Sequence, residues 1–271
     1  MKKLLTLILA LMLGATCLFT STACFGSGDD GDNKPTVTIG YTDYAPMNYE
    51  ENGVLVGFDT ELAQKIFGDL GYNIRFKLIE WSNKYTELNS GTIDCIWNGF
   101  TANVADDDGV QRSEKVDFSY NYMQNAQCII SKADAEISSL AQLDGKSVAY
   151  ESGSAGESYV DDLTGNINKK PVTSQMDAVR EVNAGTAQYA VVDILLAQSL
   201  AGQGNYSTIV INSDIVIDVE YYAIGFKKGS DLTAKVNQKL VELAGNGFIA
   251  SLAQKYNVST QVILDYSSQI A

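Results

Sequence analysis

The feature that most constrains the fold is an alternation of short apolar runs with amphipathic helical patterns, which occurs twice along the chain. The first series starts with an expected strand at 36–41, continues with a helix whose apolar residues recur at helical spacing over 62–70, and ends with an expected strand at 93–97. The second series runs from an expected strand at 147–150 to one at 209–211. Strands that alternate with helices predict mostly parallel sheets flanked by helices, so we expect an α/β fold with two lobes.

The two expected lobes are not contiguous in the sequence. The chain is expected to cross between them near 127–132 and again near 219–222, because the strand and helices after the second crossing are too few to form a third domain. Lobe 1 then comprises residues 36–129 and 222–271, and lobe 2 comprises residues 130–221. Two crossings make a hinge, and the cleft between the lobes is the expected ligand site.

Residues 1–23 have the organisation of an export signal, with a cationic start, an apolar run that ends near Phe19 and small residues before Cys24. A permanent N-terminal anchor helix is the alternative, but the apolar run is shorter than the ~20 residues that a spanning helix needs. No later segment is comparably apolar, so no membrane helix is expected in the mature chain.

The small residues before Cys24 resemble a bacterial lipoprotein cleavage site, which implies a lipid on this cysteine. Two or more acyl chains hold a protein on a membrane without a spanning helix. Residues 24–35 would then form the lipidated start and a flexible charged tether. The protein would be extracytoplasmic and anchored to the cell membrane.

The composition excludes several classes of function. The 271 residues contain no histidine, which removes Ser-His-Asp and Cys-His catalysis and histidine metal sites. The net charge is −14 and would become −16 on loss of Lys2 and Lys3, so a nucleic-acid partner is disfavoured.

Two cysteines are expected to remain in the folded part of the chain. Cys17 belongs to the expected signal and Cys24 would be acylated, which leaves Cys95 and Cys128 in apolar strand-like runs. We expect two buried thiols rather than one bridge, with the bridge as the alternative.

Six motifs follow one another at suitable distances along the chain: VGFDTELAQKI, LNSGTIDCIWNGFT, QRSEKVDFSYNYM, VAYESGSAGESYV, AQYAVVD and VEYYAIGFKKGSDL. In this order they resemble the amino-acid-binding group, family 3, of the bacterial solute-binding proteins that serve ABC importers. The resemblance covers residues 37–256. It implies a two-lobed periplasmic-binding-protein-like fold of type II, without cofactor, metal or catalytic residue. It also implies a monomer whose partners are a free amino acid and the permease and ATPase subunits of an importer.

The resemblance implies that two charged residues of the protein bind the ligand. Arg112 would bind the α-carboxylate through two parallel charge-assisted hydrogen bonds; the alternative is a surface arginine paired with Glu114 or Asp117. Asp193, at the end of the strand AQYAVVD, would bind the α-ammonium group, and the alternative is a cap of the helix that starts at Ile194.

Further residues complete the expected site at the ends of strands. Thr101 would offer its N–H and hydroxyl to the carboxylate, and Asn98 and the Gly99 carbonyl would face the amino group, with Asn98 as a turn residue as the alternative. Ser154 and Ala155 would complete the carboxylate site at a helix start, which is compatible with a simple N-cap role for Ser154.

Aromatic residues are expected around the ligand side chain. Tyr44 and Trp81 match positions whose rings sandwich that side chain, whereas Trp97 lies in an apolar strand and is expected in the core. Tyr41 stands where relatives selective for basic amino acids can carry an aspartate, which tilts the expectation away from lysine or arginine. Asp43 and Glu220 could still approach the cleft.

One segment departs from the family pattern. Ten residues separate Thr101 from Arg112, where relatives have only a few, so 102–111 is a loop insertion near the carboxylate site. Asp106, Asp107 and Asp108 within it are expected to form a solvated turn, because their spacing is not that of a calcium-binding loop.

Two other functions remain open at this point. An enzyme on the same fold, similar to a dehydratase of cyclic acids, would need a general acid from Asp, Glu, Lys, Tyr or Cys. A ligand-sensing module for a signalling partner would use the same pocket. The amino acid that is bound does not follow from the sequence.

Overall fold

The computed structural model describes residues 34–215, 217 and 219–270. The expected export signal, Cys24 and all but the last two residues of the expected tether therefore lie outside the described residues. Within the described part of the chain, none of the helices combines the length and the apolar character that crossing a membrane requires.

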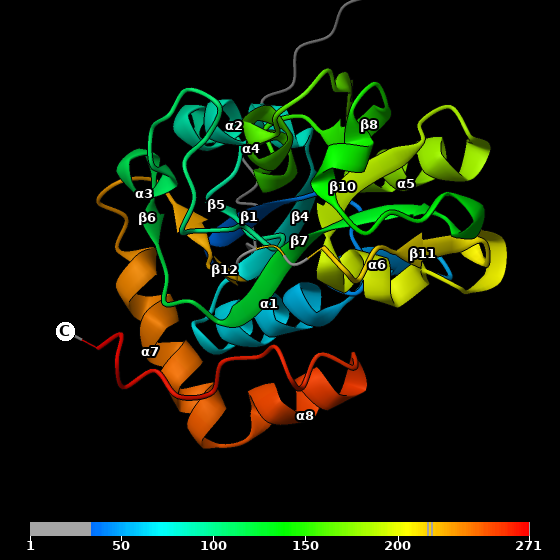
Figure 1. The fold of residues 1–271 in the computed structure, drawn as a ribbon. Helices are drawn as coiled ribbons and strands as arrows, with labels where there is room; N and C mark the ends of the chain where they lie inside the picture. The colour runs from blue at the N-terminus through cyan, green and yellow to red at the C-terminus, as the bar shows by residue number, and fades with distance from the viewer. Residues whose placement is uncertain (1–33, 216, 218, 271) are drawn as a thin grey trace, which may run out of the picture. The chain divides into compact units, whose positions relative to one another are not determined.

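Two main sheets and their helices make up the described chain (Figure 1). In chain order the elements are β1 (Thr36–Tyr41), β2 (Tyr49–Glu51), β3 (Val54–Val56), α1 (Phe58–Asp69), β4 (Asn73–Leu78), α2 (Lys84–Ser90), β5 (Cys95–Ile96), α3 (Arg112–Lys115), β6 (Asp117–Phe118), β7 (Met123–Lys132), β8 (Ser147–Glu151), α4 (Ala155–Asp162), β9 (Asn168–Val172), α5 (Gln175–Ala184), β10 (Tyr189–Asp193), α6 (Ile194–Leu200), β11 (Ile209–Ile211), β12 (Val219–Tyr222), β13 (Gly225–Phe226), α7 (Leu232–Gly245) and α8 (Phe248–Lys255).

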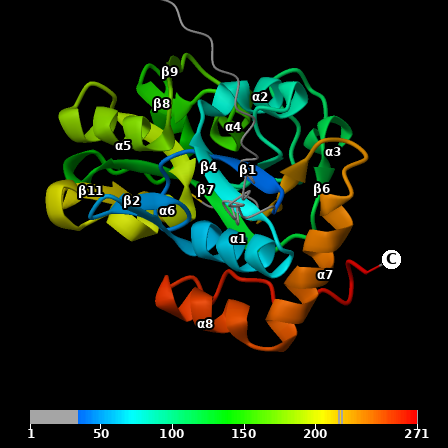
Figure 2. The ribbon, with the colours of Figure 1, turned by 180° about the vertical axis from the view of Figure 1, so that it is seen from behind.

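The first sheet has the strand order β4-β1-β5-β13-β6. Its strands β4, β1 and β5 are parallel, and β13 joins β5 and β6 in antiparallel pairs. Helices α1, α7 and α8 lie together on one side of these strands and α2 lies on the other (Figures 1 and 2). The face of α1 that the sequence predicted is buried at Leu62, Ala63, Ile66 and Phe67, and this apolar stripe fixes the helix on the sheet.

The second sheet has the order β11-β7-β10-β8-β9. Strands β10, β8 and β9 are parallel and alternate with α4 and α5, whereas β7 and β11 are antiparallel to their neighbours. In both sheets, the strands that alternate with helices are parallel. The strands β7, β11 and β13 pair with their neighbours in antiparallel orientation.

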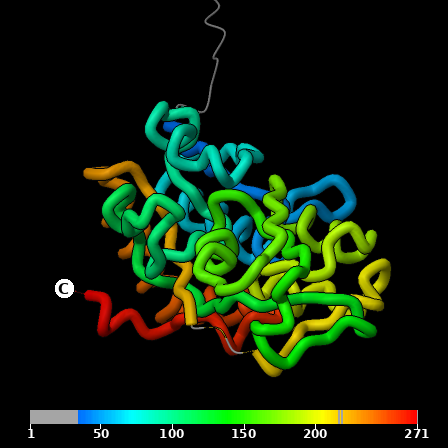
Figure 3. Tube along the Cα trace, turned by 45° about the horizontal axis from the view of Figure 1, so that its top comes forward, coloured from blue at the N-terminus to red at the C-terminus, as the bar shows by residue number. Residues whose placement is uncertain are grey.

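Strand β7 connects the two sheets. Its first half, 123–126, pairs with β12, and its second half, 127–131, pairs with β10. The C-terminal segment follows the start of β7, where Met123 bridges to Val262 (Figure 3). Two neighbouring antiparallel strands thus carry the chain from one sheet to the other and back.

The core contains the residues that the sequence assigned to it. Trp97 is fully buried, as predicted, and its ring meets that of Phe67 edge-on at 6.1 Å between centroids. Cys95 and Cys128 are both buried and unbridged, which agrees with the expected pair of thiols. Burial raises the pKa of both thiols, so they are poor nucleophiles.

Candidate functional site

The carboxyl ends of the parallel strands of both sheets meet at a small cavity. Its lining comprises Trp81, Asn98, Gly99, Thr101, Arg112, Glu151, Ser154, Ala155, Gln175 and Asp193. The structure therefore brings together all the predicted site residues except Tyr44. The cavity has a volume of about 10 Å³, which is room for the centre of about one water molecule.

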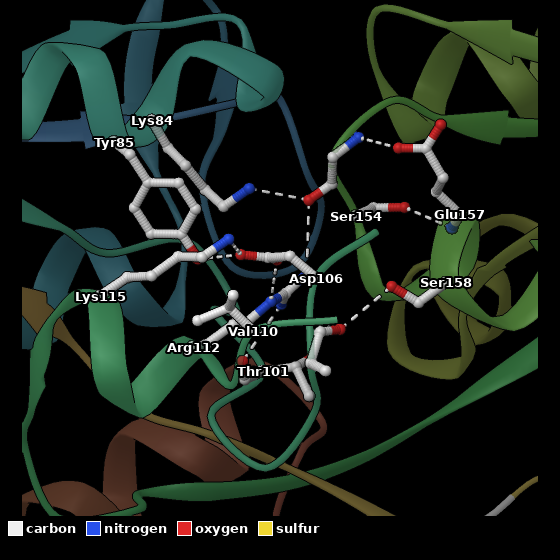
Figure 4. A network of polar contacts seen from close by, with 12 residues as sticks. Lys84, Tyr85, Thr101, Asp106, Val110, Arg112, Lys115, Ser154, Glu157 and Ser158 are labelled. Carbon is white, nitrogen blue, oxygen red and sulfur yellow. Dashed lines mark hydrogen bonds and ion pairs between the residues drawn. The ribbon is translucent and has the colours of Figure 1, made fainter. Parts of the chain in front are cut away.

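Arg112 is the first residue of α3 and is only 1% exposed, so it is not the surface arginine of the alternative interpretation. Its Nε donates to Asp106 Oδ1 at 2.7 Å, its Nη1 to the Thr101 carbonyl oxygen at 3.1 Å, and its Nη2 to the Gly153 carbonyl oxygen at 3.3 Å (Figure 4). A guanidinium has five N–H groups. One N–H on each terminal nitrogen thus has no partner among the described residues, and two is the number that a bidentate carboxylate accepts.

Asp106 corrects the expectation of a solvated turn at 106–108. Its side chain is buried and accepts hydrogen bonds from Arg112 Nε, from Lys115 Nζ at 2.8 Å and from Tyr85 Oη at 2.7 Å (Figure 4). Burial by itself would raise its pKa, but the charge of Arg112 and the hydrogen bonds from Lys115 and Tyr85 outweigh that effect and hold the pKa at about 2. The inserted loop thus supplies a permanent anion to Arg112, while Asp107 is exposed.

Arg112, Lys84 and the inserted loop also contact the β8–α4 connection and α4. The Gly153 carbonyl accepts from both Arg112 and Lys84, the latter at 2.8 Å, and Ser158 Oγ donates to the Ala105 carbonyl at 3.2 Å (Figure 4). Gly153 has a φ of +75°, and a Cβ at this position would lie 3.0 Å from the Cα of Ser82. The close approach of the lobes therefore favours glycine at this position.

Asp193 lies at the end of β10 and lines the same cavity as Arg112. Its Oδ1 accepts from Asn125 at 2.8 Å and from Gln127 at 2.5 Å, and its Oδ2 accepts from Gln175 at 2.7 Å. The side chain makes no capping hydrogen bond to α6, so the capping alternative does not describe its contacts. Burial raises the pKa of Asp193, and the amide donors oppose that rise.

Asn98 and Thr101 line the cavity, but their side chains already have protein partners. The Asn98 amide donates to the Thr42 carbonyl and to Asn48, and its oxygen accepts from the Thr42 hydroxyl. The Thr101 hydroxyl donates to Glu220 at 3.1 Å. The Asn98 side chain therefore holds the segment after β5 in place, which is compatible with its alternative role as a turn residue.

The two predicted aromatic residues occupy different places. Trp81 lines the cavity and packs edge-on against Phe100 at 5.3 Å between centroids. Tyr44 is fully buried outside the lining, where its hydroxyl shares a hydrogen bond of 2.7 Å with Tyr222. Its ring lies against Gly99, where an added Cβ would come within 2.7 Å of it.

Ser154 and Ala155 form the start of α4 as expected. The Ser154 hydroxyl caps the helix by accepting from the Glu157 N–H at 3.2 Å (Figure 4). Both residues line the cavity, so the capped helix end faces it.

Sequence reasoning missed Glu151 and Lys84. Glu151 ends β8 with its side chain 2% exposed, and Lys84 is buried with its Nζ 5.2 Å from the Trp81 ring centroid. Burial, aided by the charge of Arg112, lowers the pKa of Lys84 to about 7. A usable signal for Glu151 was an acid directly after an apolar strand run, the same position that Asp193 has on β10.

Asp59 is a buried acid beneath the site. Its Oδ2 accepts from the Gly99 N–H at 3.0 Å and from the Tyr122 hydroxyl at 2.9 Å, and burial raises its pKa to about 7 despite these donors. Asp59 is thus protonated in the folded protein at a pH where it is ionised in the unfolded chain. Its contribution to stability is present at low pH and is lost as the pH rises toward about 7.

We expect Asp59→Asn to reduce the pH dependence of stability. Between pH 5 and 7, the unfolding free energy of the wild type should fall more steeply with pH than that of the variant. The difference in slope should be up to about 1.4 kcal/mol per pH unit, which corresponds to one proton. Urea unfolding at several pH values measures this slope. Asp69→Asn, which changes an exposed carboxylate of the same helix, should keep the wild-type slope. Equal slopes for wild type and Asp59→Asn would contradict the assignment.

Comparison with known proteins identifies the family of the chain. The family model of the bacterial extracellular solute-binding proteins, family 3, matches residues 37–259. The arginine-binding extracellular protein ArtP of Bacillus subtilis is 30% identical over 260 residues, which are 94% of this chain and 98% of that protein. The L-cystine-binding protein TcyJ of Escherichia coli is 25% identical over 79% of each chain.

Solved structures of amino-acid-binding proteins are also similar to this chain. An ancestral arginine-binding protein bound to arginine is 28% identical, with a TM-score of 0.74 over 82% of this chain and 98% of that one. A substrate-binding protein of an ABC uptake transporter from Streptococcus pneumoniae, with bound histidine, is 27% identical, with a TM-score of 0.72 over 82% of this chain and 92% of that one. These likenesses confirm the predicted two-lobed α/β fold. Because the family model spans nearly all of the described chain, the protein belongs to family 3 of the bacterial extracellular solute-binding proteins.

Proposed function

We propose that this protein is an extracytoplasmic receptor that closes its two lobes over one free amino acid and delivers it to the permease of an ABC importer. The observation that carries the proposal is the pair of opposite charges at one cavity. Arg112 comes from the first lobe and retains two N–H groups without a partner among the described residues, and Asp193 comes from the second lobe. A free α-amino acid presents a carboxylate and an ammonium group to match them.

Burial explains why such a ligand would favour the closed arrangement. Both charged side chains are almost fully buried, and a buried charge is costly unless it is paired. A ligand that contacts Arg112 from one lobe and Asp193 from the other makes its full set of contacts only when the lobes meet. It therefore shifts the equilibrium toward closure by the difference in its affinity for the two states.

Relatives support the choice of ligand class and partners. The relatives named above bind arginine, histidine or cystine, and one of them is the substrate-binding protein of an ABC uptake transporter. We extend this class, a free amino acid, to the present chain, together with permease and ATPase subunits as partners. We further propose that the protein acts as a monomer, that residues 1–23 direct export, and that a lipid on Cys24 anchors it to the cell membrane.

A thermal-shift screen of the twenty amino acids and cystine tests the proposed function. A ligand at 100 times its Kd should add about 2.7 kcal/mol to the unfolding free energy. For a chain of this size that corresponds to a rise in Tm of roughly 5–10 °C. At least one amino acid should produce such a shift, and the absence of a shift with all of them would overturn the amino-acid assignment.

The enzymatic alternative has one observation in its favour, namely Glu151 in the cavity lining. Burial raises the pKa of this side chain to about 8, so it carries a proton near neutral pH and could act as a general acid. We nevertheless propose that no reaction occurs, since binding requires only the two charged contacts. Mass spectrometry of ligand recovered after long incubation should show it unchanged; a product with the mass of the ligand less water would favour the enzyme.

A further inference from the structure

Glu151 is the acid of the cavity that the proposed contacts leave unused. It lies at the carboxyl end of β8, lines the cavity, and is 2% exposed. Its Oε1 is fully buried and has no hydrogen-bond partner. Among the cavity-lining residues, all of which are described, no other side chain has a fully buried polar atom without a partner. A buried polar atom left in this way costs free energy, so it points to a group that is missing from the protein itself.

The protein supplies no counter-charge to Glu151. The charged groups that face it are Asp193 of β10, Lys84 of α2 and Arg112 of α3. Both cations already have partners, because Lys84 donates to the Gly153 carbonyl and Arg112 pairs with Asp106. Glu151 takes part in no ion pair within 34–215, 217 and 219–270. Burial and the charge of Asp193 therefore raise its pKa to about 8, against the smaller opposing effects of Lys84, Arg112 and a hydrogen bond from the Gln175 backbone N–H.

Two other buried acids are better satisfied: Asp193, which shares the cavity lining, and Glu220, which lies outside it. Asp193 accepts from the side-chain amides of Asn125, Gln127 and Gln175, and Glu220 accepts from Thr101, Asn125 and Gln127. Arg112 is already balanced by Asp106. A ligand with no net charge would use its carboxylate and ammonium groups on Arg112 and Asp193 and would leave Glu151 unpaired. A ligand with one further positive charge would satisfy it.

We infer that, given the proposed amino-acid-binding function, Glu151 determines side-chain specificity: its open oxygen receives the cationic end of the ligand side chain, and the site selects basic amino acids. This revises the expectation that the site does not bind lysine or arginine, which was based on Tyr41 in place of an aspartate. Glu151 of the second lobe supplies the acid that the first lobe lacks at position 41. The sequence could not show that the end of β8 and Arg112 share one cavity.

Arginine and citrulline provide the sharpest test, because citrulline has nearly the shape of arginine without its charge. Calorimetry should give a Kd for L-arginine roughly 10- to 100-fold lower than that for L-citrulline, the range expected for one charge-assisted hydrogen bond in a buried site. Glu151→Gln should remove most of this preference by weakening arginine binding, and citrulline affinity should stay within a few-fold of the wild type. Glu136→Gln, which changes an exposed carboxylate of the same lobe, should keep the full preference.

The outcomes separate this inference from the proposed function. Equal losses for both ligands would place Glu151 on the shared α-amino part and overturn the inference, as would an unchanged preference in Glu151→Gln. Failure of the wild type to bind any amino acid would overturn the proposed function itself. Glu151→Leu, which removes the carboxyl group without adding an amide, should also lose the preference and serves if the first variant does not fold.

Proton release gives a second readout that a merely structural role would not change. A cation that pairs with Glu151 favours its ionised form, so arginine binding at pH 7 should release a proton that citrulline binding does not. Calorimetry in phosphate and in Tris, whose ionisation enthalpies differ, measures this release. The wild type should release up to one more proton with arginine than with citrulline, and Glu151→Gln should abolish that difference. The same difference in both proteins would assign the proton to another group and overturn the inference.

Discussion

Replacement of Arg112 by alanine is expected to weaken amino-acid binding by roughly 10²- to 10⁴-fold. The estimate assumes the loss of two charge-assisted hydrogen bonds of about 1.5–3 kcal/mol each, made in a buried site. Isothermal calorimetry with the amino acid identified by thermal shift measures the change in Kd. Arg112 is the cation with two N–H groups to offer at the cavity, so the loss should exceed that for any other single side chain of the first lobe.

A conservative variant separates the geometry of Arg112 from its charge. Arg112→Lys keeps a cation beside Asp106 but loses the planar fork, and we expect it to retain part of the affinity and most of the stability. Arg180→Ala, which removes an arginine from the surface of α5, should bind as the wild type does. Affinity close to that of the wild type in a folded Arg112→Ala variant would contradict the carboxylate assignment.

Asp106→Ala should be among the most destabilising single changes in the chain. It would leave Arg112 without its ion pair in a site where the two side chains are 1% and 5% exposed, and would remove a partner of Lys115. Breaking a buried pair by removing one member typically costs about 3–5 kcal/mol. The melting temperature at pH 7 should therefore fall by roughly 10 °C, as measured by circular dichroism.

The stability of the protein at low pH should also depend on the Asp106 ion pair. Asp106 has its pKa lowered to about 2, below the value of 3.8 for an unperturbed aspartate, so its stabilising contribution is full above that value and is lost as the pH falls toward 2. The gap between wild type and Asp106→Ala should shrink over this range. Asp107→Ala changes the adjacent, exposed acid of the same loop and is the matched control. Equal melting temperatures for the two variants would contradict a structural ion pair.

The elements of the fold were predicted well where a local pattern determined them. The strands at 36–41 and 209–211 have the predicted limits, because each is a clear apolar run. The run 93–97 forms only the two-residue strand β5, and the strand predicted at 147–150 extends one residue further, to Glu151. These differences arise because strand limits depend on the neighbouring strands that pair with them, and those neighbours are distant in sequence.

The candidate site was predictable to the extent that its residues match the motifs of the family. Arg112 and Asp193 could be named in advance, and both line one cavity. The side-chain partners of Asn98 and the position of Tyr44 outside the lining could not, because they depend on contacts with residues such as Thr42 and Tyr222. Hydrogen-bond partners separated by many residues leave no periodic trace in the sequence.

The sequence by itself determined the α/β class, the two-lobed organisation and the absence of histidine chemistry, because these follow from local periodicity and composition. Only the tertiary structure decided what the charges do. Asp106 was predicted to be a solvated turn residue, and the fold buries it against Arg112. Glu151 ends an ordinary strand, and the fold brings it into the cavity lining with one oxygen buried and without a partner. Burial and pairing set the chemistry of an ionisable group, and both are properties of the packed chain.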